Sequence, residues 1–439
     1  MSMKDKMLHP WYVWGILMFF TILFGISYVF IAGYTIYDTL YGLWRIFALQ
    51  DRLISDYLHY DIGGVGAGLI NSGLSGLLVL LFFVLSKYEG YGLGMGALGL
   101  TMGLGLLGKN PLNMLPIMLG GLLYSLYTKR PHKEHVIMAV FATCLAPMVS
   151  TPAFLYQFGY AGAYGNIVGR AVGVLIGLCI GFFINSMGVF IKKSHEGMNL
   201  YNIGFGAGLI AVSIVVLSRT LGFNFYTIHG FVSYGNNLVL QIYLIMVTVF
   251  FFACGFFCIP RYKRLGLFAL SNIKQILCFK ADDNDFYKKY GKGYTYLAMG
   301  VFGLTSLIIM IVFNVEYNGP VLGAIISLIS WGGFGKSVVH SLTIIAGVIL
   351  AGFVRYLAIG AALNSMDIYT SAFWGTCLSP MVKSFGYRWG IVVGIVHFAF
   401  ATNVTAFHAG LNLYNNGFAA GLVCVVMIPL IRGFERRKD

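Results

Sequence analysis

The stretch that decides the fold is HEGMNLYNIGFGAGL at residues 195–209, because it returns as HAGLNLYNNGFAAGL at residues 408–422. The two copies share the pattern H-x-G-x-N-L-Y-N-x-G-F-x-A-G-L and lie 213 residues apart. Both are polar, glycine-bearing segments inside otherwise apolar sequence. A duplicated motif of this kind is typical of membrane transporters built from internal repeats.

The composition of the chain excludes a water-soluble domain. Hydrophobic residues make up 58% of the 439 residues and charged residues 10%, with a mean hydropathy of +0.80. Soluble domains carry about 25% charged residues. Apolar runs recur from end to end, and many are long enough to cross roughly 30 Å of hydrocarbon.

The net charge of +14 would suit a nucleic-acid partner, but its distribution argues against one. The basic residues form short clusters between apolar runs, at residues 129–133, 192–193, 261–264, 288–292 and 432–438. This is the pattern of cytoplasmic loops. We therefore expect a multi-pass protein of the plasma membrane with both termini cytoplasmic, surrounded by lipids and without a nucleic-acid partner.

Fourteen apolar segments are candidate spans, seven in each half of the chain. In the first half they are residues 11–33, 63–86, 91–107, 111–128, 136–156, 165–191 and 201–218. In the second half they are residues 238–259, 294–315, 318–334, 337–356, 360–381, 388–405 and 413–431. Residues 34–60 and 261–290 are too polar to cross, so we expect them to be amphipathic or interfacial.

The repeat extends beyond the opening motif. Gly108-Lys109 matches Gly335-Lys336 at a spacing of 227 residues, and TCLAPMV at residues 143–149 matches TCLSPMV at residues 376–382. The order of the blocks is the same in both halves, and the changes in spacing indicate loop insertions.

An odd number of spans in each half requires the second half to be inverted. We therefore predict an all-α integral membrane protein with about 14 transmembrane helices in two inverted-topology repeats. Residues 1–219 form the first repeat and residues 220–439 the second, with a basic cytoplasmic linker at residues 260–293.

The N-L-Y-N-x-G-F block has two interpretations. In the first, its asparagines cap the seventh span of each half. In the second, a broken helix presents its N–H groups and positive end to a solute. Two Asn, a Tyr and a Gly exceed what one cap needs, which favours a binding site. The predicted solute-binding residues are Asn199, Tyr201, Asn202 and Phe205 with their repeat partners Asn412, Tyr414, Asn415 and Phe418.

His195 and His408 stand four residues before the first Asn of each block. A lone His near a membrane face is usually a surface or capping residue. A symmetric pair suggests hydrogen-bond donors or proton-linked gates, so both join the candidate site. We expect no metal, because carboxylate and further His partners are absent from the motif.

Lys109 and Lys336 open the fourth span of each half, where a positive charge opposes the helix macrodipole. They therefore do not serve helix stability. They either extend along the apolar surface to lipid headgroups or attract an anion. Asn113 and His340 lie one turn further on, and we predict that they line the pathway on the same face.

Thr143 and Thr376 begin the T-C-L-x-P-M-V blocks, whose prolines interrupt the fifth span of each half. An interior Pro breaks the helical hydrogen-bond ladder, and such breaks persist in membranes where neighbours or a cavity satisfy the freed carbonyls. A simple kink and a substrate-facing break both fit, and the second places Thr143 and Thr376 in the candidate site.

At these residues the chain resembles an uncharacterised bacterial membrane family defined by a duplicated domain of unknown function. The H-x-G-x-N-L-Y-N-x-G-F and T-C-L-x-P-M-V blocks carry the resemblance over nearly the full length. It implies a multi-span membrane protein without an established activity.

A second part of the sequence is similar to urea transporters, whose halves are inverted repeats with an N-P motif ahead of a helix. Asn110-Pro111 fits this pattern, but Ser337-Val338 replaces it in the second half, and seven spans per half exceed the five of that family. This resemblance implies a small-solute pathway in each protomer of a possible homo-oligomer.

Together these features predict a transporter or channel for a small neutral or weakly anionic solute, with its site at the repeat interface near the bilayer midplane and no cofactor. Scarce intramembrane carboxylates argue against a cation pump. The alternative is a non-transporting scaffold or a subunit of a larger membrane complex. We do not expect an enzyme, because the sequence holds no G-x-S-x-G, Walker or H-E-x-x-H motif.

Overall fold

The computed structural model describes residues 8–51, 53, 55–159, 162, 165–225, 232–259 and 285–435. Within these ranges the chain is helical, and its only β-type pairings are two isolated bridges, Asp56 with Leu107 and Asp285 with Phe334. Most of the predicted basic linker, residues 260–284, lies outside the described residues.

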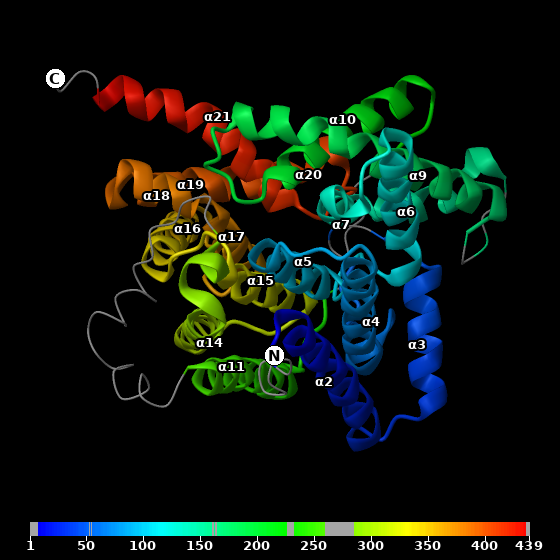
Figure 1. Cartoon of the computed structure of the whole chain (residues 1–439), viewed down its shortest axis with the longest axis horizontal. Coiled ribbons are helices and arrows are strands. Elements are labelled where there is room, and N and C mark those ends of the chain that lie inside the picture. Colours follow the sequence, from blue (N-terminus) through cyan, green and yellow to red (C-terminus); the bar gives the residue numbers. More distant parts are fainter. Residues whose placement is uncertain are drawn as a thin grey trace.

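Most helices of the two halves can be matched in order, although Ile36–Ala48 in the first half has no counterpart among the described residues of the second (Figure 1). The first half contains α2 (Pro10–Ile31), α3 (Ile36–Ala48), α4 (Gly64–Leu85), α5 (Tyr91–Leu104), α6 (Pro111–Thr128), α7 (Val136–Ala142), η2 (Thr143–Leu145), α8 (Pro147–Ser150), α9 (Ile167–Ser194) and α10 (Asn202–Thr220). The second half contains α11 (Asn237–Cys258), α14 (Phe286–Val312), α15 (Gly319–Ser330), η5 (Trp331–Gly333), α16 (Val338–Ile359), α17 (Met366–Gly375), η6 (Thr376–Leu378), α18 (Ser379–Phe385), α19 (Tyr387–Asn403), α20 (Thr405–His408) and α21 (Asn415–Glu435).

Nine described helices are long and apolar enough to cross a membrane, or ten if the bent pair Val136–Leu145 and Pro147–Phe154 is one span. The described helices therefore do not confirm the predicted count of 14. Helices α5 and α15 have only 14 and 12 residues, which makes them about 21 and 18 Å long. Nearly all their residues are buried in the protein. An apolar run alone does not distinguish such a helix from a lipid-facing span.

The outer surface of the long helices is apolar. Phe19 on α2, Leu175 on α9 and Leu357 on α16 are between 57% and 68% exposed. Large apolar side chains at this density on several long helices require a hydrocarbon environment. The protein is therefore a membrane-embedded helical protein.

Helices α5 and α15 lie side by side at the centre of the molecule (Figure 1). A Cβ atom on Gly103 would lie 2.3 Å from the Gly323 carbonyl oxygen, and one on Gly323 would lie 2.4 Å from the Gly103 carbonyl oxygen. Only glycine allows this approach of two backbones. The contact is reciprocal between residues of the two halves.

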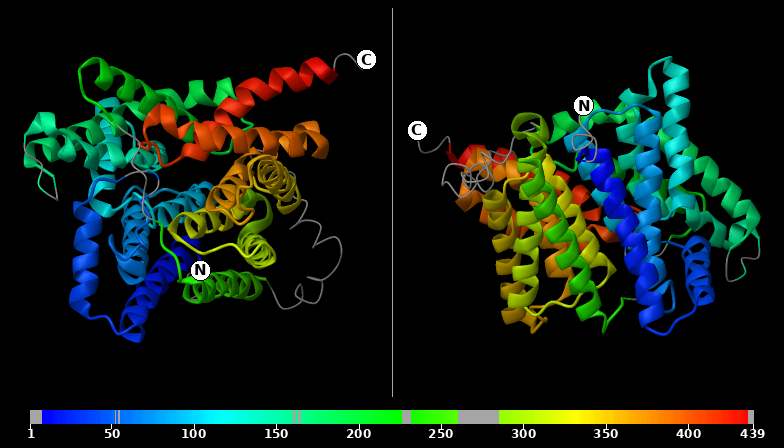
Figure 2. Two further views of the ribbon diagram at one scale, coloured as in Figure 1. Left: turned by 180° about the vertical axis from the view of Figure 1, so that it is seen from behind. Right: turned by 60° about the horizontal axis from the view of Figure 1, so that its bottom comes forward.

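Matching helix pairs flank this centre, as the two views of Figure 2 also show: α6 packs on α9, and α16 packs on α19. A Cβ atom on Gly120 of α6 would lie 2.2 Å from the Leu178 carbonyl oxygen of α9. A Cβ atom on Gly347 of α16 would lie 2.3 Å from the Ile391 carbonyl oxygen of α19. The same close helix contact thus occurs once in each half.

Two carboxylates join the halves on either side of the centre. Asp56 is fully buried and accepts hydrogen bonds from Ser233 N, Ser233 Oγ, Leu58 N and Gly319 N at 2.7 to 3.2 Å. Asp285 accepts from Gly92 N at 3.3 Å. Gly319 and Gly92 begin or nearly begin α15 and α5. Each carboxylate therefore holds the start of the short central helix of the other half.

Helix α3 lies at the edge of the molecule within the polar segment 34–60 (Figure 1). Tyr37 and Leu40 are exposed on one face, while Ile46 is buried on the other. Both faces therefore carry apolar side chains, and the amphipathic character of the helix stays a prediction. Its placement at a membrane interface stays a prediction.

The capping box of α3 predicts a pH effect. The Thr35 hydroxyl and then the Thr35 backbone N–H donate to the Asp38 carboxylate and lower its pKa. A lowered pKa in the folded state means that this stabilisation is present above the ordinary pKa of Asp and is lost as the pH falls through the lowered value. We expect the hydrogen-exchange protection factors of α3 amides to fall in this acidic range. Asp38→Asn should abolish this pH dependence, and an unchanged profile in that variant would contradict the assignment.

Candidate functional site

Both copies of the H-x-G motif form a left-handed turn. Glu196 and Gly197 have φ values of 52° and 75°, and Ala409 and Gly410 have 51° and 74°. A non-glycine residue in this conformation is strained by about 1–2 kcal/mol. The same strain occurs at equivalent positions, so the turn is a shared feature of both halves. It leads the chain into the N-L-Y-N block from α9 in the first half and from α20 in the second.

Each motif histidine fixes its own loop. His195 Nε2 lies 2.7 Å from Asn202 Oδ1, and His408 Nε2 lies 2.9 Å from Asn415 Oδ1. Both histidines are fully buried. Their Nδ1 atoms accept weak hydrogen bonds from the backbone N–H of Asn199 and Asn412, each at 3.4 Å. These contacts give the histidines a structural role in positioning the loops.

The first asparagine of each block reaches the opposite half. Asn199 Nδ2 donates to the Gly417 carbonyl at 2.9 Å, and Asn412 Nδ2 lies 3.5 Å from the Gly204 carbonyl. A Cβ atom on Gly204 would lie 3.0 Å from Gly417 Cα, so the starts of α10 and α21 cross in direct backbone contact. The duplicated motifs thus meet, and neither asparagine caps its helix in the usual way.

The N-L-Y-N and T-C-L blocks also meet across the halves. Leu200 N donates to the Cys377 carbonyl at 3.0 Å, and Leu413 N donates to the Cys144 carbonyl at 2.9 Å. The T-C-L segments are short 3₁₀ turns, and the first ends the piece Val136–Leu145, which meets Pro147–Phe154 at an angle of 59°. Carbonyl groups freed by these breaks are therefore satisfied by the other half.

The two motif phenylalanines pack against each other beyond this crossing. Phe205 and Phe418 stack with ring centroids 6.2 Å apart. Each ring fills the space beside a glycine of the opposite helix, Phe205 at Gly421 and Phe418 at Gly208. Both rings are buried and form a small core, so they hold α10 against α21.

A first cavity of about 320 Å³ lies against the first N-L-Y-N block. Its inner part is bordered by Tyr201, Tyr414 and Trp331. It continues through Lys192 and Gly197 into a wider surface cavity of about 580 Å³. Asn199, Asn202 and His195 line it as well.

A second cavity of about 200 Å³ lies against the second block. Its walls are formed by residues that the repeat spacing makes equivalent to those of the first cavity. These pairs include Asn202 with Asn415, Leu200 with Leu413, Lys192 with Thr405, Ile137 with Thr370, Phe141 with Trp374, and Trp331 with Leu104. The two cavities therefore occupy corresponding places in the two halves.

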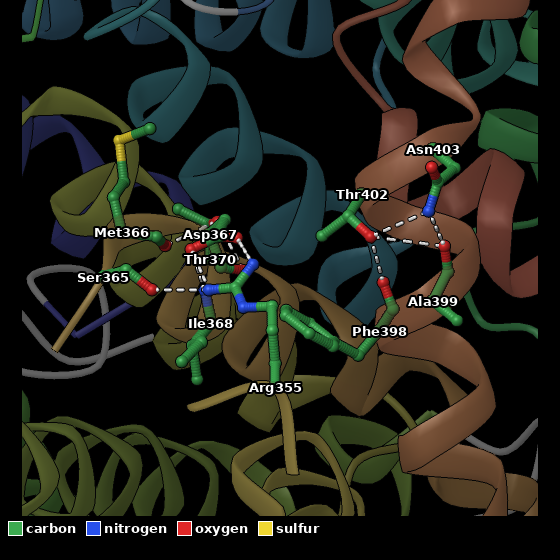
Figure 3. A network of polar contacts seen from close by, with 10 residues as sticks. All are labelled: Arg355, Ser365, Met366, Asp367, Ile368, Thr370, Phe398, Ala399, Thr402 and Asn403. Carbon is green, nitrogen blue, oxygen red and sulfur yellow. Dashed lines mark hydrogen bonds and ion pairs between the residues drawn. The ribbon is translucent and has the colours of Figure 1, made fainter. Parts of the chain in front are cut away.

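An ion pair stands at the wall of the second cavity (Figure 3). The Arg355 guanidinium binds the Asp367 carboxylate and donates to Ser365 Oγ at 2.9 Å, and its Cζ lies 5.0 Å from the Phe398 ring centroid. Asp367 and the nearby Thr402 line the cavity. The carboxylate is thus neutralised where it borders the cavity.

Lys109 and Lys336 are buried, so the structure excludes extension to lipid headgroups. Lys336 Nζ donates to Tyr201 Oη at 2.9 Å and to Thr376 Oγ1 at 2.7 Å. Lys109 Nζ lies 5.2 Å from the Tyr414 ring centroid. The preceding Gly108 and Gly335 have φ values of 80° and 72°, which turn both lysines inward.

Three other predicted site residues have different surroundings. Asn113 forms a capping box with Asn110 and donates to Asp51 Oδ2 at 2.9 Å, away from both cavities. His340 lies beside Tyr387 at 5.8 Å between ring centroids and lines neither cavity. The Thr143 hydroxyl donates to the Val140 carbonyl at 2.6 Å. None of these three residues touches the central cluster, whereas Thr376, the repeat partner of Thr143, does so through Lys336.

Sequence reasoning missed Trp331 and the pair Asp56 and Asp285. Trp331 lies 4.9 Å from the Tyr201 ring, but its repeat equivalent is Leu104, so the repeat gave no signal. Asp56 and Asp285 are each followed by an aromatic residue, Tyr57 and Phe286. This repeated dipeptide of Asp and an aromatic residue is the sequence signal by which Asp56 and Asp285 could have been found.

Comparison with known proteins gives one match. A family model described as a protein of unknown function, DUF1576, matches residues 35–220 and again residues 268–433. No curated protein and no solved structure matches the chain. The resemblance to an uncharacterised family is thus confirmed, whereas the resemblance to urea transporters has no support.

Proposed function

The chain belongs to the DUF1576 family of proteins of unknown function, and we propose that it is a transporter or channel for a small neutral or weakly anionic solute. In this proposal the halves are inverted-topology repeats in the plasma membrane, and the solute passes between the crossed N-L-Y-N blocks near the bilayer midplane.

The observation that carries the proposal is the correspondence of the two cavities. Their walls share many repeat-equivalent residues, and each cavity lies against the N-L-Y-N block of a different half. Halves related by a two-fold axis in the membrane plane place such cavities on opposite faces of the membrane. Two access routes that end at one closed centre are what alternating access requires.

The reciprocal contacts support the two-fold relation. Gly204 and Gly417 are repeat equivalents in direct contact, and the contact of Gly103 with Gly323 has its repeat equivalent in the contact of Ser330 with Gly96. In a two-fold arrangement, each contact between the halves recurs between the repeat equivalents of the same two residues. A scaffold would have no need for corresponding cavities.

The test is solute flux in proteoliposomes with plugged cavities. Ile137→Trp should fill the first cavity and Thr370→Trp the second, because these equivalent residues line them. We expect each variant to reduce the flux of urea or of formate, whichever the wild type conducts, by about tenfold or more. Leu357→Trp on the exposed face of α16 is the matched control and should conduct as the wild type does.

Folding of each variant is checked by its elution profile and thermal midpoint in detergent. Full flux through both plugged variants, with folding intact, would contradict the proposal. Wild-type vesicles that pass neither probe faster than protein-free vesicles would also count against it.

A further inference from the structure

Two buried lysines lie next to the crossing without an acidic partner. Lys109 is 0% exposed and Lys336 2% exposed. In the described part of the chain, no carboxylate lies within ion-pair distance of either ammonium group. Buried charges in proteins are normally paired, because an uncompensated charge loses its hydration without return. The missing partner is therefore a negative group.

Both ammonium groups border aromatic rings of one cavity. Lys109 Nζ faces the Tyr414 ring at 5.2 Å, while Lys336 Nζ faces the Tyr201 ring at 4.8 Å and the Trp331 ring at 5.9 Å. Tyr201, Tyr414 and Trp331 all line the first cavity. The inner end of this cavity is thus flanked by positive charge from both halves.

The two lysines differ in their hydrogen bonds. Lys336 has two hydroxyl acceptors, Tyr201 and Thr376. Among the described residues, Lys109 Nζ has no hydrogen-bond partner, and the same holds for Trp331 Nε1, which lies beside Gly96 of α5. The cluster therefore holds unsatisfied donors from Lys109 and Trp331, and what it lacks is an acceptor.

The entrance to the first cavity has the matching charge. Lys192 and Lys193 border the wider surface cavity through which the first one opens. The acidic residues at this mouth are neutralised, Glu134 by Arg130 at 3.6 Å and Glu196 by Arg432 at 2.6 Å. A positive mouth raises the local concentration of anions.

We propose that the solute is a small anion, which binds in the first cavity beside Tyr201, Tyr414 and Trp331 and is held there by the positive charge of Lys109 and Lys336 next to these rings. The inference rests on the proposed function for the route by which the anion arrives.

The test uses two probes of nearly the same shape, sodium formate and formamide, which differ in charge. Thermal unfolding of the purified full-length protein is followed with each probe, and with sodium nitrate and sodium bromide as further anions. We expect anions to raise the midpoint of the wild type in a saturable way and formamide to leave it unchanged.

Lys109→Met is the decisive variant, and Lys133→Met, at an exposed position of the short 3₁₀ helix His132–Glu134, is its control. Met keeps the side-chain length and removes the uncompensated charge, so Lys109→Met should unfold at a higher temperature than the wild type without anion. Its anion affinity should fall by more than about tenfold. Lys133→Met should behave as the wild type in both respects.

Absence of anion stabilisation in the wild type, or equal stabilisation by formamide, would overturn the inference, as would full anion binding by Lys109→Met. If the protein conducts a neutral solute and Lys109→Met conducts it equally well, the inference is wrong and the proposed function stands. If the protein binds anions through Lys109 but conducts no solute, the inference stands and the proposed function is wrong.

Discussion

Asp56→Asn is expected to lower the free energy of unfolding by about 3 kcal/mol or more. The carboxylate accepts four hydrogen bonds, two on each oxygen, from Leu58, Gly319 and Ser233. An Asn side chain has one oxygen, so its NH₂ group must face two buried donors, and each unsatisfied donor costs about 1–3 kcal/mol. The change is measured from denaturant or thermal unfolding in detergent.

Two comparisons sharpen this test. Asp61 is exposed, and its contact with His59 is long at 3.7 Å, so Asp61→Asn should change stability by less than about 0.5 kcal/mol. Asp285 accepts longer backbone hydrogen bonds, at 3.2 and 3.3 Å, so Asp285→Asn should fall between the two. Equal stability of the Asp56 and Asp61 variants would show that the carboxylate does not hold α15 in place.

Gly204→Val is expected to separate α10 from α21 and to abolish transport. The first added carbon would already lie 3.0 Å from Gly417 Cα, and the two methyl groups have no space between the backbones. Overpacking of this kind costs about 1–3 kcal/mol, and the Asn199 hydrogen bond to the Gly417 carbonyl should be lost with it. Thermal midpoint and proteoliposome flux measure the two effects.

The contact between α10 and α21 can also be tested from the α21 side. Gly417→Val should be as harmful as Gly204→Val, because a Cβ on Gly417 would lie 3.1 Å from Gly204 Cα. Gly433→Val on the same α21 helix has open space around it and serves as the control. A Gly204 variant that is as stable and active as the Gly433 variant would refute the crossing.

Much of the fold could be predicted from the sequence because the repeat is visible as duplicated sequence blocks. The shared order of the N-L-Y-N and T-C-L blocks predicts matching helices in the two halves, and most helices of the structure can be matched in that order. The predicted count of 14 spans is not confirmed, because apolarity reports burial in protein as well as in lipid. The glycine-rich segment 91–107 is predicted to be a span, whereas α5 is a short helix buried against α15.

The site could be predicted only in part. The repeat singled out Asn199 and Asn412, and the structure brings their loops together. It gave no sign that Lys109 and Lys336 are buried, because a Lys near a helix start normally reaches water or headgroups. Which lysine finds hydroxyl partners depends on sub-ångström placement of Tyr201 and Thr376, which no sequence pattern records.

The most direct test of the central claim is the sidedness of the two cavities. Lys192→Cys places a thiol in the first cavity and Thr405→Cys places one at the equivalent position of the second. Both variants are labelled in sealed vesicles with a membrane-impermeant thiol reagent, added inside or outside, against the labelling of the seven native cysteines. Corresponding cavities of inverted halves predict that the two positions react from opposite sides of the membrane. Reaction of both positions from the same side would contradict the inverted arrangement and the transport pathway built on it.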